Sequence, residues 1–276
     1  MRGLAEFVMK GRRQAIIAVL LLGLLPLLYF INPVVVALVL LRKGSKEAAL
    51  IFVWAILPLI GWAAIGDQFP LLLLLGVTAL AWILRETESW EFTLLASVVV
   101  GVGVEFYLRV QPAMLDSMLA QLQAYMEQSN LQPGMELQEL RYFLGSSLSA
   151  VCMILASALL ILARWMQATL YNPGGFQLEF HALRMEHRVV LVLIGVLLLA
   201  NFGIVVPSSW VLYLVLPLMF AGIALVHAVV AKQKMSGMWL AVFYALLMLP
   251  IVFQLTVMLA IIDSWYDFRT RMNKAA

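Results

Sequence analysis

Glu105 and Arg109 are an acidic and a basic side chain inside an otherwise apolar run, residues 92–110. Ionisable side chains are costly inside a membrane-crossing segment, so those that occur there usually have a function or bind each other. Their spacing places both on one face of a helix, where they can form an ion pair. The pair therefore predicts either a binding site for a small polar ligand or an ion pair at the membrane interface.

Several other apolar runs carry a polar side chain at a similar depth. These residues are Asp67, Arg141, Ser146, Ser147, Asn201 and Gln254. A pocket that opens to one side of a membrane needs polar atoms from several helices at one level. We therefore expect Glu105, Arg109, Asn201 and Gln254 to bind a substrate. The alternative is that these groups are only the hydrated ends of their helices.

The motifs of common catalytic and metal sites are missing from the chain. His181, Glu186 and His187 lack the His-Glu-x-x-His spacing of a zinc site. Gly145-Ser146-Ser147 lacks the flanking residues of a nucleophilic serine, and no Walker sequence for nucleotide phosphates occurs. We therefore expect a protein that is not an enzyme, has no metal site and needs no cofactor.

The composition places the chain in a lipid bilayer. Of its 276 residues, 64% are hydrophobic and 12% charged, and the mean hydropathy is +1.00. The formal net charge is +3, but the basic residues lie in short segments between apolar runs, which argues against nucleic-acid binding. The one cysteine, Cys152, allows no intrachain disulfide. The sequence predicts a single integral membrane domain over residues 1–276.

Nine apolar stretches predict an all-α, polytopic transmembrane helical bundle with eight or nine spans. They cover residues 15–31, 33–41, 48–65, 69–84, 92–110, 142–165, 189–206, 208–230 and 238–262. Asn32-Pro33 predicts a turn after the first stretch, because proline and the residue before it avoid helix interiors. With that turn and a cytoplasmic N-terminus, most Lys and Arg residues lie on the cytoplasmic side, as the positive-inside rule requires.

Residues 111–141 form a predicted extracytoplasmic amphipathic loop. Within it, Met and Leu side chains recur at helical spacing over residues 114–126, and Gln132-Pro133-Gly134 predicts a turn. We consider two roles for the predicted helix: lying on the outer leaflet, or covering an outward cavity as a mobile lid.

Residues 166–188 form a predicted cytoplasmic amphipathic loop. Asn172-Pro173-Gly174-Gly175 predicts a turn. A short helix should follow, with Phe176, Phe180 and Leu183 on one face and Glu179 and Arg184 on others. This segment is either a connector on the membrane surface or a docking site for a cytoplasmic or membrane protein partner.

The same segment carries a resemblance to a known family. Asn172-Pro173-Gly174-Gly175-Phe176, with Glu179-Phe180 and Leu183-Arg184, resembles the YybS-like family of bacterial polytopic membrane proteins of unknown function. Arg164-Trp165-Met166, Trp265-Tyr266-Asp267-Phe268-Arg269 and the segment 33–44 are similar to that family too. The resemblance implies a multi-pass protein of the bacterial inner membrane.

This family is in turn distantly similar to the membrane-embedded substrate-binding (S) components of energy-coupling-factor vitamin transporters. The similarity implies an outward pocket for a small substrate and docking to a coupling protein with separate ATPase subunits. We therefore expect a small-molecule binding or transport-related subunit without its own ATPase. The alternative is a membrane scaffold or assembly factor that acts through protein partners.

Overall fold

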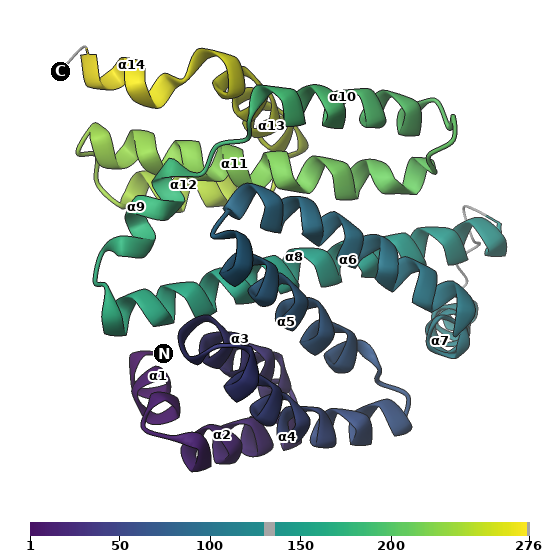
Figure 1. Ribbon diagram of the computed structural model, residues 1–276. Helices are drawn as coiled ribbons and strands as arrows, with labels where there is room; N and C mark the ends of the chain where they lie inside the picture. Colours follow the sequence, from purple (N-terminus) through teal and green to yellow (C-terminus); the bar gives the residue numbers. More distant parts are fainter. Residues whose placement is uncertain (130–135, 275–276) are drawn as a thin grey trace. The chain divides into compact units, whose positions relative to one another are not determined.

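Every element of the described chain is a helix. The computed structural model describes residues 1–129 and 136–274, and Figure 1 shows their arrangement. The internal contacts divide the chain into two compact units, residues 1–173 and 174–276. The all-α prediction is confirmed over these described ranges.

The first unit contains eight α-helices and one short 3-10 helix in its described residues. They are α1 (Arg2–Met9), α2 (Arg12–Leu24), η1 (Leu28–Ile31), α3 (Asn32–Lys43), α4 (Ser45–Ala64), α5 (Phe69–Thr87), α6 (Trp90–Val110), α7 (Ala113–Gln128) and α8 (Leu137–Tyr171).

The second unit is built around one apolar helix. Its elements are α9 (Gly175–Ala182), α10 (His187–Asn201), η2 (Ser208–Trp210), α11 (Val211–Lys232), α12 (Met238–Leu246), α13 (Pro250–Tyr266) and α14 (Phe268–Lys274). α11 supplies most of the buried side chains and packs against α13. Gly222 permits this close approach, because a Cβ at that position would lie 2.3 Å from the Thr256 carbonyl oxygen.

Five helices of the described chain are long and apolar enough to cross a membrane. They are α4, α5, α6, α8 and the continuous segment 208–232. A sixth crossing is possible if α12 and α13, bent by 112° at their junction, form one broken span. The remaining predicted crossings fall on shorter helices: α2 has 13 residues, α3 has 12 and α10 has 15. A straight crossing of the ~30 Å hydrocarbon core needs about 20 residues.

A short enclosed helix, α3, lies at the centre of the first unit. It contacts α2, α4, α5 and α8, and its side chains from Asn32 to Leu41 are all buried. The predicted helix over residues 33–41 is therefore confirmed. The predicted end of the preceding helix at residue 31 and the predicted turn at Asn32-Pro33 are wrong, because α2 already ends at Leu24 and Asn32-Pro33 are the first residues of α3. Pro26 accounts for this end, since it holds Leu25 in an extended conformation.

The two predicted loops are more helical than expected. α8 runs for 35 residues and includes positions 137–141 and 166–171, which were assigned to loops. Helical residues 114–126 lie in α7 as predicted, and the turn at 172–174 is present. The predicted turn Gln132-Pro133-Gly134 lies outside the described residues.

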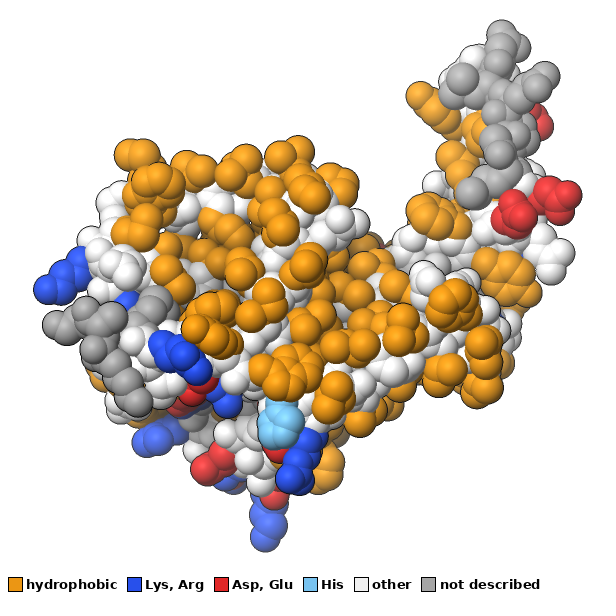
Figure 2. Space-filling view, turned by 90° about the horizontal axis from the view of Figure 1, so that it is seen from above, with side chains coloured by type: hydrophobic (Ala, Val, Ile, Leu, Met, Phe, Trp, Pro, Cys, Tyr) orange, Lys and Arg blue, Asp and Glu red, His pale blue; other side chains and the backbone are white. Residues whose placement is uncertain are grey.

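Hydrophobic side chains cover much of the molecular surface. On the face drawn in Figure 2 they form a broad area, and charged side chains gather toward its margins. Exposed side chains include Trp54, Leu57 and Ile60 on α4 and Val99 and Phe106 on α6. A lipid bilayer is the surrounding that accommodates such surfaces.

Candidate ligand-binding site

A hollow of about 420 Å³ lies in the first unit among α6, α7 and α8. Its lining includes both residues of the predicted pair, Glu105 and Arg109, together with Arg141 and Ser146. These four side chains were placed at similar depth by the sequence, and the structure brings them to one hollow. It therefore combines charged, polar and apolar groups, as small-molecule sites do.

The α6 wall carries the predicted ion pair. Arg109 Nη2 donates a hydrogen bond to Glu105 Oε1, which confirms the pairing expected from their spacing. Glu105 is 5% exposed, whereas the side chain of Arg109 is 49% exposed. The carboxylate is thus the buried partner, and the guanidinium extends from it to the accessible part of the hollow.

The opposite wall consists of the first turns of α8. Gln138, the adjacent Arg141 and Tyr142, and the adjacent Gly145 and Ser146 lie on successive turns of the helix, so they share one face. The Cζ atom of Arg109 lies 5.8 Å from the centre of the Tyr142 ring, within cation–π range. An aromatic ring and an amide therefore face the α6 ion pair.

α7 closes the third side of the hollow. Leu115 and Leu119 are the residues that it buries, and Leu115 lines the hollow. Arg141 Nη2 donates a hydrogen bond to Asp116 Oδ1, which ties α7 to α8 by an ion pair exposed on both sides. α7 is therefore fastened by a small apolar contact and one solvent-accessible ion pair, a weak attachment.

The charges at the hollow suit an anionic group. Each guanidinium has five N–H donors in a planar fork, more than one carboxylate oxygen can accept. Arg109 and Arg141 both line the hollow and both keep more than a third of their side chains accessible. Two arginines on facing helices can thus bind one carboxylate or phosphate through several charge-assisted hydrogen bonds.

The other predicted substrate-binding residues lie elsewhere. Asn201 is the last residue of α10 and Gln254 lies in α13, so both belong to the second unit, and both are exposed. Asp67 accepts a hydrogen bond from the Tyr29 hydroxyl at 3.2 Å and does not line the hollow. The site is thus built from α6, α7 and α8 alone.

The predicted docking segment packs inward within the second unit. Phe176 and Phe180 stack with ring centres 5.7 Å apart, and Phe180 meets the His227 ring of α11 edge-on at 5.3 Å. On the outer side of α9, Leu178 is 73% exposed. The turn residues Asn172, Pro173 and Gly174 are exposed, whereas Gly175 is buried. Within this segment the turn, Gln177, Leu178 and Ala182 are exposed, and Leu178 is the large apolar residue among them.

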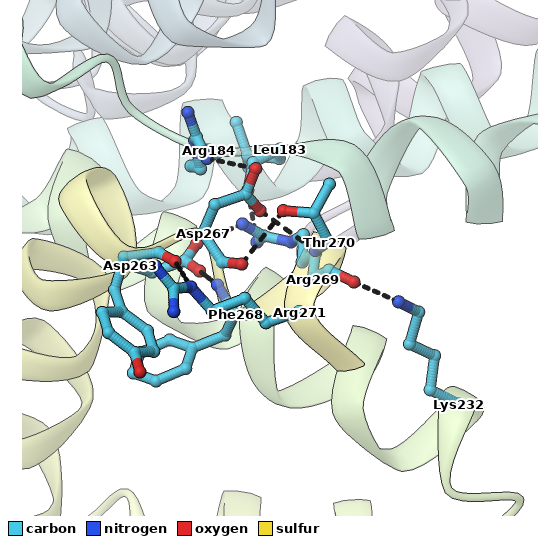
Figure 3. Close-up of polar contacts among 10 residues, drawn as sticks. Leu183, Arg184, Lys232, Asp263, Asp267, Phe268, Arg269, Thr270 and Arg271 are labelled. Atoms are coloured by element: carbon cyan, nitrogen blue, oxygen red, sulfur yellow. Dashed lines mark hydrogen bonds and ion pairs between the residues drawn. The ribbon is translucent and has the colours of Figure 1, made fainter. Parts of the chain in front are cut away.

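Two sequence motifs that are distant in the chain meet in the second unit (Figure 3). Arg184 forms an ion pair with Asp267 at 2.8 Å, and Arg269 Nη2 donates a hydrogen bond to the Leu183 carbonyl oxygen at 2.6 Å. Arg269 also pairs with Asp263, which is 2% exposed. These contacts join the segment after α9 to the junction of α13 and α14.

The charges at this junction perturb one another. Hydrogen bonds from Thr270, together with the Arg184 guanidinium, hold the pKa of Asp267 below its usual value. Burial lowers the pKa of Arg269, while the Asp263 carboxylate acts in the opposite direction. The ion pairs Arg184–Asp267 and Arg269–Asp263 thus interlock at this junction and fix the end of α13.

A histidine pair lies beside the aromatic face of α9. The His181 and His227 rings are 6.4 Å apart, and His227 Nε2 shares a hydrogen bond of 2.8 Å with the Tyr244 hydroxyl. Burial lowers the pKa of His181, and the positive charge of Arg269 lowers it further. Among the described residues, no group of three or more His, Cys, Asp or Glu could hold a metal ion.

Sequence reasoning did not name Gln138 and Tyr142 as site residues. Gln138 lies within the predicted loop 111–141, and nothing in its local pattern marks it as a binding residue. A helix that begins at Leu137 places Gln138, Arg141 and Tyr142 on one face, with Tyr142 one turn before Ser146. The register was recoverable from the sequence, but only with the start of α8 known.

Comparison of the chain with protein-family models, with curated proteins and with solved structures gave no match.

Proposed function

We propose that this chain is a membrane-embedded subunit that binds a small polar molecule with an anionic group, as part of a transport process. It carries no ATPase of its own and resembles S components in this respect. The proposed setting is the bacterial inner membrane, with a cytoplasmic N-terminus and eight or nine membrane passages, some of them made by helices too short to cross alone.

The observation that carries the proposal is the buried Glu105 carboxylate paired with a half-exposed Arg109 inside a hollow of about 420 Å³. An ion pair that served only as an interface contact would need no cavity beside it. Here Arg141, Tyr142 and Gln138 of α8 line the same cavity from the other side. The convergence of polar groups on one space favours ligand binding.

The weak attachment of α7 supports an entry path. An anionic ligand at Arg141 competes with Asp116 for the same guanidinium. Binding would then release the ion pair that fastens α7 to α8, which makes α7 the proposed lid of the site.

The test is native mass spectrometry of the protein taken from its own membrane in nanodiscs. We expect a small-molecule adduct on the wild-type protein and its loss from the Glu105→Ala/Arg109→Ala variant. Arg2→Ala/Glu6→Ala is the matched control, because it removes another helical ion pair of the same spacing, fully outside the hollow. An adduct that persists in the first variant contradicts the proposed site.

One observation favours a second function, that of a scaffold or assembly factor. Leu178 is an exposed apolar residue next to the exposed Asn172-Pro173-Gly174 turn. A protein partner that docks there would co-purify with wild type and be lost from Leu178→Asp. Partner loss without any small-molecule adduct on the wild-type protein would support the scaffold over the binding subunit.

A further inference from the structure

A second hollow, which we call the lateral groove, lies between α4 and α5 in the first unit. It has a volume of about 350 Å³ and an almost entirely apolar lining. The lining residues are Leu40, Ser45, Ala48, Ala49, Phe52, Leu75, Thr78, Ala79 and Trp82. Small side chains on both helices create the space, while Leu75 and Trp82 remain exposed along its edges.

One end of the groove is fixed by hydrogen bonds. Arg85 of α5 donates to the carbonyl oxygens of Leu40 and Leu41 at 3.0 and 2.9 Å. The end of α5 thus lies against the end of α3, where α4 begins after Gly44. Leu40 and Ser45 line the groove at this end.

Two lysines stand at the same end. Lys43 closes α3 and Lys46 is in the first turn of α4, and both are exposed. Lys43 follows Leu40 by three residues and Lys46 precedes Ala49 by three, so each shares a helix face with a lining residue. Neither lysine lies within ion-pair distance of a carboxylate in the described part of the chain; Glu47 pairs with Arg12 and also feels the charge of Lys43.

The negative side chains near this end are Glu47, which pairs with Arg12 in the first turn of α4, and Glu86, one turn beyond Trp82 on α5. Positive charge is therefore concentrated on the α3–α4 side of this end. Eight residues of helix on each wall, 45–52 and 75–82, give a groove roughly 10 Å long. That length matches a large part of one leaflet of a ~30 Å hydrocarbon core.

We propose that the lateral groove binds one anionic phospholipid, with an acyl chain along α4 and α5 and the phosphate between Lys43 and Lys46. Dispersion contacts with the apolar lining hold the chain. The lysines supply the preference for a negatively charged headgroup, since basic residues at a membrane surface attract anionic lipids. Trp82 lies at the headgroup level, where tryptophan is enriched in membrane proteins.

The experiment is native mass spectrometry of the delipidated full chain in detergent, titrated with dioleoylphosphatidylglycerol or dioleoylphosphatidylcholine. We expect the anionic lipid, dioleoylphosphatidylglycerol, to be retained more strongly than the zwitterionic dioleoylphosphatidylcholine. Lys43→Gln and Lys46→Gln should each lower this retention about fivefold. Lys234→Gln is the control for charge alone, because this exposed lysine belongs to the second unit. Higher ionic strength should reduce the preference in the wild-type protein.

A groove-filling variant tests the acyl-chain position separately. Ala49 is exposed in the groove, so Ala49→Trp fills the space without displacing the core. We expect it to lose the tightly held lipid while the lysines remain. Equal retention of both lipids by the wild-type protein overturns the headgroup assignment, and full retention by Ala49→Trp overturns the groove. A change from oligomer to monomer in Ala49→Trp, with lipid retention unchanged, would identify a protein helix as the occupant instead.

Discussion

At the residue scale, the stability of the protein depends on the partner of the buried Glu105 carboxylate. It is 5% exposed, and the Arg109 guanidinium balances its charge. Arg109→Ala removes the guanidinium that pairs with this buried carboxylate, so we expect the free energy of unfolding to fall by ~1–3 kcal/mol. Thermal unfolding in detergent measures this change.

The same residues offer an internal control. In a Glu105→Gln background the carboxylate is absent, and Arg109→Ala should then cost much less than it does alone. A double-mutant cycle gives the coupling between the two side chains directly. Equal costs in both backgrounds would show that the ion pair adds nothing to stability.

His181 gives a pH dependence whose sign follows from its surroundings. Burial and the Arg269 charge lower its pKa in the folded protein below the unfolded value of about 6.5. As pH falls below about 6.5, the unfolded chain takes up a proton before the folded one does, so stability decreases until the folded pKa is passed. The apparent Tm should therefore decline between pH 7.5 and pH 5.

The variant His181→Gln should flatten that decline. His187→Gln is the comparison, because His187 is an exposed histidine at the start of α10 and its removal should leave the decline in place. The neighbouring His227 ring, 6.4 Å from His181, is present in both variants. A decline of equal slope in wild type and His181→Gln would assign the pH dependence to other groups.

At the element scale, the junction of α13 and α14 depends on one buried ion pair. Asp263 is 2% exposed and accepts hydrogen bonds from Arg269 and from the Phe268 backbone N–H. Arg269→Ala leaves Asp263 without its cation, and we expect a loss of ~3–5 kcal/mol. Arg184→Ala removes a partly exposed pair and should cost less than ~1 kcal/mol. Chemical unfolding measures both losses. A larger loss of unfolding free energy in Arg184→Ala than in Arg269→Ala would contradict this interpretation.

Helix identity was predictable from the sequence, and helix ends were much less so. Long apolar runs correctly indicated α4, α5, α6 and α11. Prolines account for part of the difference between the predicted and the observed helix ends. Pro26 ends α2 and Pro250 begins α13 after a bend, whereas the buried Pro58 and Pro217 lie inside continuous helices. The same residue type gives opposite outcomes because packing around the freed carbonyl decides whether the helix continues.

The site was predictable to the extent that it depends on local spacing. Glu105 and Arg109 pair because they are one turn apart on a single helix. The ion pair of Asp116 with Arg141 joins α7 to α8, which are different helices separated in the sequence by a predicted turn. No periodicity within one helix predicts such a contact, and the assignment of Asn201 and Gln254 to the second unit could not be read from depth alone.

At the scale of the whole molecule, the boundary between the two units coincides with the Asn172-Pro173-Gly174 turn. The hollow at Glu105 and the lateral groove use only residues of the first unit. We therefore expect a 1–173 fragment to insert as a helical unit and to retain the small-molecule adduct of the full chain. Native mass spectrometry and circular dichroism of the fragment provide the measurement. A helical fragment without the adduct would mean that the second unit contributes to binding.

The enclosure of α3 sets an order for the biogenesis of the protein. With 12 residues, this helix is too short to leave a translocation channel as an independent span. One of the bonds that cap its last turn comes from Gln167, which donates to the Leu41 carbonyl oxygen from 126 positions further along the chain. In the nascent chain, the apolar α3 therefore lacks part of its final contacts while α4 to α8 are synthesised. It reaches its final place only after α8 has emerged from the ribosome.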